Sequence, residues 1–456
     1  MSSIPNKIKN KLIELATRDR QSSLIDKFAD TNRYQKFSFI EQDILFDFSK
    51  THISEELLTL YTEFAEHIDF TKRRSAFFAG EKINQTEGRS VLHTLLRAGG
   101  TALSSKINPQ LVAQSSKSHR AFIGQLEKLS DRIKGSEPRI TDLIHIGIGG
   151  SSLGTQLVYE ALKPLGSALR VHFVSNIDAH QLIEVLSECD ARSTLVFGIS
   201  KTFTTAETLQ NVNSVLDWMR DNGISEPINN LYAVTANPEQ AIKFGIDDSR
   251  VIAFPEWVGG RYSVWSAVSI SAAAVIGHEG IEEFLEGARA MDAHFLNAPL
   301  GENICFMSAA LDHYYTNLFK STTRAVFAYD YRLRSLVPYL QQLETESNGK
   351  DRQQDGQPVD QLTSPVVWGG VGTDVQHSVF QMLHQGTSLI PSEFILIKRV
   401  DHNLSNHHNE LLANGIAQTA ALLVGQDRGD VLKHEPNVAN NELALNAKIF
   451  SGNKPS

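Results

Sequence analysis

The chain has 456 residues, a length that favours two or three domains, and 41% of them are hydrophobic and 21% charged, as in ordinary globular proteins. This composition argues against a disordered or a fibrous protein. The formal net charge of -9 disfavours nucleic acid and anionic lipid as partners, so an anionic substrate would need a local cationic pocket.

Cysteine usage and the apolar runs bear on the compartment. Cys189 and Cys305 are far apart and have no CxxC partner, which argues against a disulfide framework or a zinc site and fits a reducing cytoplasm. The amino terminus has no apolar signal core, and no apolar run long enough to span a bilayer follows. We therefore expect a cytoplasmic protein that does not cross a membrane.

The predicted elements change in character twice along the chain. Residues 1–135 show mainly helical spacing, including QKFSFIEQDILFDFSKT, and are predicted to form a helical arm. Residues 136–285 contain short apolar runs separated by helix-length segments: LIHIGIGG, VHFVS, STLVFGIS, LYAVTA and RVIAF. Residues 286–456 repeat this alternation with TRAVFAY, SPVVWGG and SEFILIK. The pattern predicts two α/β domains with parallel sheets, although the closing FSGNKPS is not typical of the end of a folded domain.

A glycine turn follows the first strand of the middle segment, in LIHIGIGGSSLG. Gly147 and Gly149 give GxG, but Ser152 stands where a dinucleotide-binding GxGxxG has its third glycine. A plain tight turn is the structural alternative. The pattern favours a turn whose backbone approaches an anion.

A hydroxyl-rich segment, SKTFTTAET, follows a later strand. Thr204 and Glu207 fit a capping box, so a helix is predicted to begin just after the hydroxyl cluster. The backbone amides and dipole of a helix amino terminus favour a phosphate, although the threonines could also serve only as caps. The side chains gathered at this terminus are Ser200, Lys201, Thr202 and Thr205.

An arginine and two glutamates complete the charged candidates. Arg261 follows a Gly-Gly pair ahead of an apolar helix, and a buried arginine needs an anionic partner, either a structural carboxylate or a ligand. The adjacent glycines favour the ligand. Glu344 and Glu346 precede a Ser-Asn-Gly turn, and a glutamate can take a proton from the carbon beside a carbonyl. The spacing leaves open which of them serves, or whether both are solvated surface acids.

Histidines occur twice on one predicted helix, in QHSVFQMLHQGT. His377 and His384 are expected to share a helix face, but their spacing of two turns is a weak metal signal, and no metal site is predicted. His377, at the helix start, could shuttle protons instead. The pair His407 and His408 is expected only to cap or pack a helix.

Six motifs occur in the order seen in the glucose-6-phosphate isomerase family: IGIGGSSLG, SKTFTTAET, VGGRYSVWSA, ESNGK, QHSVFQMLHQGT and LLANGIAQTAALLVG. The chain resembles that family over roughly residues 60–456. The resemblance implies two sugar-isomerase-type three-layer α/β sandwich domains, at 136–285 and 286–456. It also implies a homodimer with shared active sites, a sugar phosphate as the small-molecule partner, and no metal or organic cofactor. The implied reaction interconverts glucose 6-phosphate and fructose 6-phosphate through an enediolate.

The resemblance also assigns roles to the candidates. Glu346 becomes the base and Glu344 a bystander, Arg261 stabilises the enediolate oxygens, and His377 assists ring opening from the other subunit. The residues that would hold the substrate are Ser151, Ser200, Lys201, Thr202 and Thr205 for the phosphate, Gly260 for the sugar oxygens and Gln342 for orientation.

The sequence departs from the family pattern in places. The family's GTNGQH is GTDVQH here, and Ser152 and Thr155 replace an aspartate and a proline. The family continues past FSGNKPS into a segment with a GVELGK-type motif and a ring-opening lysine, which this sequence does not contain. We therefore expect an incomplete second domain and reduced turnover. The alternatives are a sugar-phosphate sensor of the same fold and an amino-sugar phosphate isomerase.

Overall fold

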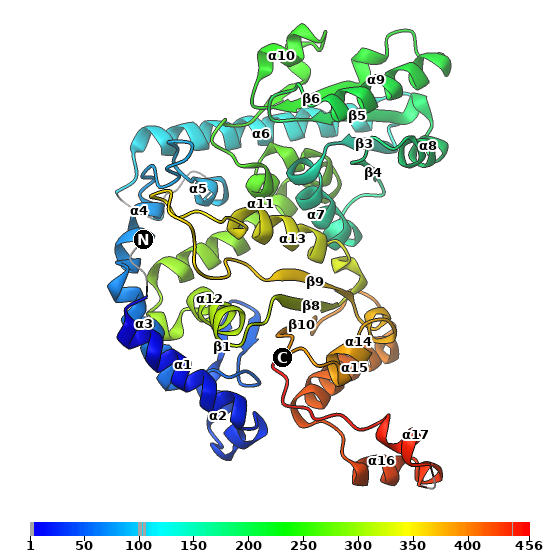
Figure 1. The fold of residues 1–456 in the computed structure, drawn as a ribbon. Helices are drawn as coiled ribbons and strands as arrows, with labels where there is room; N and C mark the ends of the chain where they lie inside the picture. The colour runs from blue at the N-terminus through cyan, green and yellow to red at the C-terminus, as the bar shows by residue number, and fades with distance from the viewer. Residues whose placement is uncertain (1–3, 99–102, 104–105, 440) are drawn as a thin grey trace. The chain divides into compact units, whose positions relative to one another are not determined.

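The computed structural model describes residues 4–98, 103, 106–439 and 441–456 (Figure 1). The chain divides into two compact units. The first combines Met1–Thr71 with Asn297–Ser456, and the second is the continuous stretch Lys72–Leu296.

The second unit is built on a parallel sheet with the strand order β4-β3-β5-β6-β7. Its strands are β3 (Asp142–Ile146), β4 (Arg170–Val174), β5 (Thr194–Ile199), β6 (Leu231–Thr235) and β7 (Val251–Ala253). The helices of this part of the chain are α4 (Phe70–Phe78), α5 (His93–Arg97), α6 (Pro109–Gly135), α7 (Leu153–Leu162), α8 (Ala179–Ser187), α9 (Ala206–Asp221), α10 (Pro238–Lys243) and α11 (Ile270–Asn297). All five apolar runs predicted as strands form this sheet, so the α/β prediction is confirmed for this unit.

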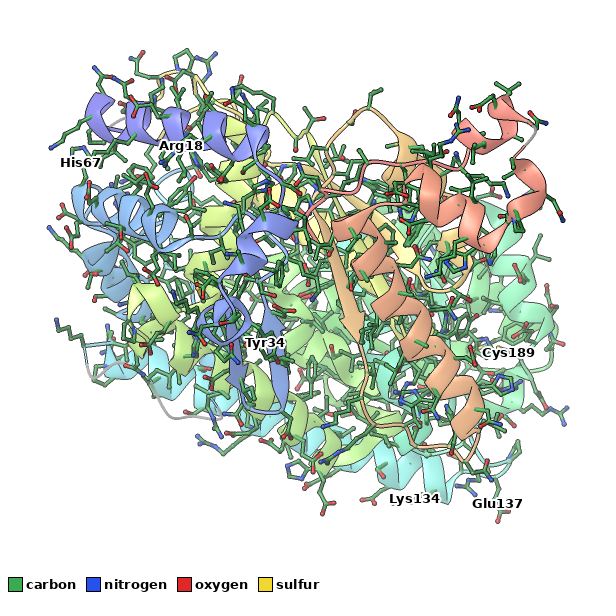
Figure 2. All side chains as sticks on the ribbon, turned by 90° about the horizontal axis from the view of Figure 1, so that it is seen from below. Arg18, Tyr34, His67, Lys134, Glu137 and Cys189 are labelled. Atoms are coloured by element: carbon green, nitrogen blue, oxygen red, sulfur yellow. The ribbon has the colours of Figure 1, made fainter. Side chains whose placement is uncertain are left out.

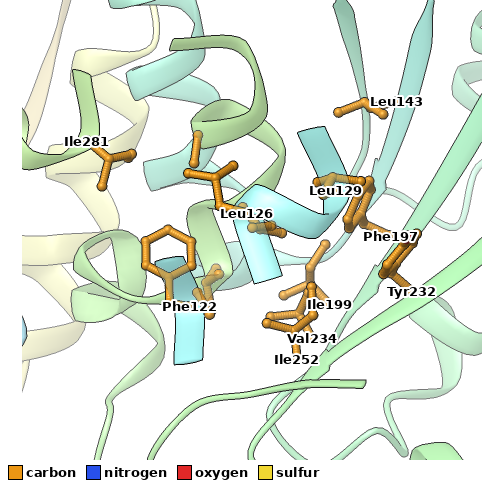
Figure 3. Close-up of a cluster of buried hydrophobic side chains, with 14 of the residues drawn as sticks. Phe122, Leu126, Leu129, Leu143, Phe197, Ile199, Tyr232, Val234, Ile252 and Ile281 are labelled. Atoms are coloured by element: carbon orange, nitrogen blue, oxygen red, sulfur yellow. The ribbon is translucent and has the colours of Figure 1, made fainter. Parts of the chain in front are cut away.

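Alternate side chains along these strands face two helical layers. On one face, Phe197 and Tyr232 pack with Leu129 of α6, in the cluster shown in Figure 3. On the other face, Val196 packs in a cluster with Val212 of α9. The strands read as continuous apolar runs because both faces of this sheet are covered, and full burial of one such side chain contributes about 1.5–3 kcal/mol.

The first unit contains a second parallel sheet with the order β10-β8-β9. Its strands are β8 (Thr323–Tyr329), β9 (Val366–Val371) and β10 (Ser392–Leu396), and a separate hairpin pairs β1 (Ser38–Glu41) with β2 (Ile44–Asp47). Its helices are α1 (Asn6–Gln21), α2 (Arg33–Phe37), α3 (Glu55–His67), α12 (Ile304–His313), α13 (Leu336–Asn348), α14 (Phe380–Gln385), α15 (Ser405–Val424), α16 (Arg428–His434) and α17 (Glu442–Asn446). The prediction of a parallel sheet from TRAVFAY, SPVVWGG and SEFILIK is confirmed.

This sheet also lies between helices. Phe327 packs with Phe380 of α14 and Leu422 of α15 on one face. Val326 packs with Val337 of α13 on the other. Helix α13 therefore rests on the opposite face of the sheet from α14 and α15.

The amino-terminal residues do not form one separate arm. Leu12 of α1, Leu57 of α3 and Met307 of α12 share a buried cluster, so the first 71 residues belong to the same compact unit as the second sheet. Helix α6, also within the predicted arm, instead covers the first sheet. The boundaries of the predicted segments 1–135, 136–285 and 286–456 thus reflect local sequence patterns, whereas the boundaries of the two compact units are set by tertiary contacts.

One segment predicted to be helical folds as a hairpin. Phe39 of β1 pairs with Phe46 of β2, and both are partly buried against the amino-terminal cluster, while Ile40 and Leu45 are exposed. The turn includes Gln42 at a positive φ of 54°. The helical expectation for QKFSFIEQDILFDFSKT is wrong because its aromatic residues follow a period of two as well as a helical one.

The closing FSGNKPS is packed against the rest of its unit. Lys454 is 8% exposed and its ammonium donates to the carbonyls of Leu383 and His384 at the end of α14. Asn453 accepts a hydrogen bond of 2.6 Å from the amide of Leu24. Distant contacts, and not local periodicity, therefore hold this segment in place.

Within the described residues, no helix combines the length and apolar character needed to cross a membrane.

Candidate active site

The glycine turn and the Gly-Gly-Arg turn meet backbone to backbone in the second unit. A Cβ on Gly150 would lie 2.2 Å from the carbonyl carbon of Gly260 and 2.6 Å from the nitrogen of Arg261. The hydroxyl of Ser263 donates to the Gly150 carbonyl over 3.0 Å. Only glycine fits at position 150, so the structure brings the turn carrying Ser151 together with Gly260 and Arg261.

A buried histidine is hydrogen-bonded to the glycine turn. The Nε2 atom of His145, on β3, lies 2.7 Å from the carbonyl oxygen of Ser151, and its Nδ1 atom lies 2.7 Å from Ser271 Oγ. Burial lowers the pKa of His145 to about 4, although the bond to Ser151 opposes this shift. The neutral ring therefore fixes the turn without adding charge. Sequence analysis missed this residue because a single polar side chain in an apolar strand gives no signal of its partner.

The second hydroxyl-rich turn lies between β5 and α9. Ser200 Oγ is 2.9 Å from Thr205 Oγ1, and Thr202 Oγ1 is 2.7 Å from Thr204 Oγ1. Helix α9 begins after Thr205 as its cap residue, and the hydroxyl of Thr205 bonds to Ser200 in place of the helix amides. The predicted capping box of Thr204 with Glu207 is wrong, because Thr204 lies one residue before the cap. The alternative that these threonines only cap the helix loses support, which leaves the amino terminus of α9 available to an anion.

Lys201 lies within this turn. Its carbonyl accepts hydrogen bonds of 3.0 Å from the hydroxyl of Thr235 and from the amide of Ala236, so β6 fixes its main chain. Burial, and then the positive charge of Arg89, lower the pKa of the Lys201 ammonium. A bound anion would offset both effects and hold the amine in its charged form.

Arg261 is half-buried in a short 3-10 segment, Gly260–Trp265. Its guanidinium carbon lies 5.1 Å from the centre of the Tyr262 ring. The helix predicted to follow it is α11, which begins at Ile270 after a second short 3-10 turn.

The two glutamates of ESNGK differ in their surroundings. Both lie in the last turns of α13, which extends to Asn348, so the predicted turn begins later than expected. Glu344 bonds to Arg324, whereas Glu346 is exposed. Gln342 is four residues before Glu346 and therefore lies on the same face of the helix, and its Oε1 atom is buried.

Glu344 belongs to a cluster of carboxylates around Arg324 of β8. The guanidinium is also 3.4 Å from Asp312 of α12 and 3.0 Å from Glu393 of β10. Burial raises the pKa of Asp312 to about 6 and also raises that of Glu393. The cluster ties α12 and α13 to the sheet, which gives Glu344 a structural task, whereas Glu346 is accessible to solvent.

The two histidines of QHSVFQMLHQGT do not share one helix. His377 ends a short 3-10 segment, Asp374–His377, and is exposed. His384 lies in α14, where its Nε2 atom is 2.9 Å from Gln418 Oε1 and its ring packs on Phe450. The predicted common face is wrong because the chain leaves the helical path between the two residues. The structure places His408 8% exposed with Nε2 3.1 Å from the Lys398 carbonyl, as expected of a packing residue.

The site residues fall into two sets. Residues 151–261 lie in the second unit, where the structure packs the glycine turn against the Arg261 turn. Gln342 and Glu346 share α13 in the first unit, and His377 follows β9 there.

One group among the described residues has the spacing of a metal site. Ligand atoms of Asp142, His172 and Cys189 lie within 4.8 Å of one another (Cys189 is labelled in Figure 2). Asp142 already receives hydrogen bonds from Arg170 at 2.9 Å and from His172 at 2.8 Å. Burial, and then the charge of Asp142, raise the pKa of the Cys189 thiol to about 12. A protonated thiol and an arginine-paired carboxylate favour a structural ion pair over a metal centre.

Comparison with known proteins gives consistent results. A family model described as phosphoglucose isomerase matches residues 47–456. A glucose-6-phosphate isomerase of Rhizorhabdus wittichii is 45% identical over 424 residues, which cover 92% of this chain and 83% of that one. One from Zymomonas mobilis is 43% identical, covering 89% of this chain and 78% of that one. The crystal structure of a glucose-6-phosphate isomerase from Chlamydia trachomatis matches with a TM-score of 0.83 and 31% identity, covering 98% of this chain and 85% of that one.

Proposed function

The chain belongs to the phosphoglucose isomerase family, and on that premise we propose that it interconverts glucose 6-phosphate and fructose 6-phosphate through an enediolate. The observation that carries this proposal is the close packing of Gly150 on Gly260 and Arg261, because it joins an anion-binding turn to a guanidinium on one rigid backbone. We further propose that the protein works in the cytoplasm as a homodimer with shared active sites. Residues 136–285 and 286–456 would provide its two sugar-isomerase-type domains.

Binding begins at the phosphate. The amino terminus of α9 supplies backbone amides and a favourable dipole, and the hydroxyls and ammonium around it supply charge-assisted hydrogen bonds. The residues proposed to hold the phosphate are Ser151, Ser200, Lys201, Thr202 and Thr205. Gly260 would lie against the sugar oxygens, and Gln342 would orient the open chain.

The chemistry moves one proton between neighbouring carbons. The cyclic sugar first opens, with His377 of the other subunit transferring the proton between the ring oxygen and the hydroxyl. Glu346 then takes the proton from the second carbon of the aldose and returns it to the first, while the hydroxyl proton on the oxygen of the second carbon passes to the oxygen of the first. Both hydrogens stay within the substrate's own change, so no electron acceptor is needed. Arg261 stabilises the negative charge that develops on the enediolate oxygens. This proposal requires neither a metal nor an organic cofactor.

The direct test is turnover in both directions by the purified chain, with and without a chelator. Glu346→Gln should lower kcat by about 10²- to 10⁴-fold, because it removes the general base, while sugar-phosphate binding survives. Glu344→Gln is the matched control: it should lower the melting temperature by weakening the Arg324 cluster, yet leave kcat of the folded protein near that of the unaltered chain.

Three outcomes would contradict the proposal. Binding of sugar phosphate without turnover would favour a sensor of the same fold. Activity that a chelator abolishes and metal restores would contradict the cofactor-free mechanism. A larger loss of kcat in Glu344→Gln than in Glu346→Gln would reverse the assignment of the base.

A further inference from the structure

The side chain of Arg261 ends on a column of aromatic rings. The Tyr262 ring, 5.1 Å below the Arg261 guanidinium carbon, stacks on the imidazole of His93 with centroids 4.5 Å apart and planes 9° apart. His93 in turn packs against Phe77, with centroids 5.3 Å apart. The column joins α4, α5 and the 3-10 segment after Gly259, and its residues Phe77, His93 and Tyr262 all lie within the second unit.

The column contacts the side chain of Arg261, whereas the backbone contact with Gly150 acts on its main chain. Packing of Gly150 against Gly260 holds the main chain of Arg261, but an arginine side chain keeps several rotatable bonds beyond its Cα. A guanidinium placed over an aromatic face loses part of that freedom and is attracted to the ring. A charge that stabilises a transition state is most effective when it is already in place before the reaction.

His93 is suited to support a ring that already lies near a cation. Burial, and then the charges of Arg97 and Arg261, lower the pKa of His93 to about 3. The imidazole is therefore neutral at ordinary pH and adds no third positive charge beside the two arginines. Its contact with Tyr262 is therefore the stacking of two uncharged aromatic rings.

We propose that Tyr262, supported by His93, is a positioning residue that aims the Arg261 guanidinium at the enediolate. The inference rests on the proposed isomerase function, since it concerns the same reaction. It predicts that the column matters more to the charged intermediate than to the ground-state substrate, which the phosphate turns hold.

The same unit contains a matched column for comparison. The guanidinium carbon of Arg132 lies 5.4 Å from the centre of the Tyr232 ring, and Tyr232 stacks on Phe197 with centroids 5.1 Å apart and planes 15° apart. This second column has the same order of arginine, tyrosine and aromatic ring, and has no assigned role in the reaction. Tyr232→Leu is therefore a control for the structural cost of removing such a ring.

The first experiment measures kcat, KM and melting temperature for Tyr262→Leu, Tyr262→Phe and Tyr232→Leu. Tyr262→Leu should lower kcat by about tenfold or more with KM changed less than about twofold, because a misaimed group is costly in the transition state. Tyr262→Phe keeps the ring and should restore kcat. Tyr232→Leu should lower the melting temperature while leaving kcat of the folded protein intact.

The second experiment measures binding in a Glu346→Gln background, where turnover is suppressed. The probes are a five-carbon sugar-acid phosphate, whose carboxylate imitates the enediolate charge, and a hexitol 6-phosphate, which carries the same phosphate but has no charge at its other end. Adding Tyr262→Leu should weaken binding of the acid by about tenfold and leave binding of the hexitol unchanged. If Tyr262→Leu does not fold, His93→Ala carries the same test, because it removes the supporting ring and leaves Tyr262 and Arg261 in place.

The outcomes separate the two proposals. Absence of turnover in the unaltered chain would overturn the proposed function. The binding experiment does not need turnover, so a selective loss of binding of the acid in Tyr262→Leu would still show that Tyr262 positions Arg261. Full kcat in Tyr262→Leu, equal damage by Tyr262→Phe, or equal loss of both probes would overturn the positioning role alone.

Discussion

His145 shows how one buried side chain affects both the shape and the charge of the glycine turn that carries Ser151. The Ser151 carbonyl can only accept, so His145 must donate from Nε2, and its Nδ1 atom then accepts from the hydroxyl of Ser271. This pattern is that of the neutral ring, which burial favours. A protonated ring would carry two donors and leave Nδ1 facing Ser271 with a charge that burial disfavours.

His145 is one of the buried groups, together with His93, that make stability depend on pH. The pKa of His145 is about 4 in the folded protein and about 6.5 when unfolded, so its stabilising contribution is complete above pH 6.5 and is lost as the pH falls towards 4. Between pH 7 and pH 5 the loss amounts to about 2 kcal/mol. His145→Gln keeps a donor for Ser151 but does not titrate, so denaturant unfolding at both pH values should show a smaller pH effect than in the unaltered chain.

The control for this prediction is His180→Gln, because the His180 side chain is 95% exposed. It should keep the full pH effect. An identical pH response in His145→Gln and the unaltered chain would show that His145 does not remain neutral in the fold.

At the scale of elements, two strand–helix turns make up the proposed phosphate site, and they differ in what they would offer an anion. The turn between β3 and α7 offers bare backbone at Gly150, which has no space for a side chain. The turn between β5 and α9 offers hydroxyls and an ammonium at a helix amino terminus. We expect the first turn to let an anion come close to the backbone, and the second to offer it positive charge.

Lys201→Ala combined with Thr205→Ala should therefore weaken binding of a sugar-phosphate inhibitor. Each charge-assisted hydrogen bond contributes about 1.5–3 kcal/mol, so calorimetry should detect a loss of at least tenfold in affinity. Lys243→Ala, which removes an exposed lysine of α10, is the control for the change in net charge. An unchanged dissociation constant in the double variant would place the phosphate elsewhere.

The strands and the turns could be predicted from sequence because their signals are local. Continuous apolar runs marked β3 to β10, and the hydroxyl cluster before α9 marked its turn. The residue that caps α9 could not be predicted, because Thr204 and Thr205 are adjacent and identical in type. They differ in their tertiary partners: the hydroxyl of Thr205 contacts Ser200, and that of Thr204 contacts Thr202. No local period links Phe77, His93 and Tyr262, which meet only through tertiary packing. Likewise, the ion pair of Glu344 with Arg324 and the exposure of Glu346 depend on tertiary packing.

At the scale of the whole molecule, the proposed homodimer leads to a subunit test. If His377 acts across subunits, mixing Glu346→Gln chains with His377→Ala chains creates dimers with one intact site and one doubly altered site. After random exchange, the activity should recover to about a quarter of that of the unaltered dimer. Turnover would be measured before and after subunit exchange, with exchange confirmed by mass.

Mixing Glu346→Gln chains with themselves supplies the baseline, since no intact site can arise. If activity does not recover although subunit exchange is confirmed, His377 serves the site of its own subunit.

The first unit is formed from two stretches of the chain that the second unit separates, and this affects how the protein folds during synthesis. During synthesis, α1 and α3 leave the ribosome long before α12, and the hydrogen bond from Tyr314 to Asp19 spans 295 positions of the chain. The second unit, being continuous, can complete its own sheet while the amino-terminal helices still lack their partners. Those helices must wait with apolar faces uncovered, so the slowest and most chaperone-dependent step of biogenesis should be the late return of the carboxyl-terminal half to the beginning of the chain.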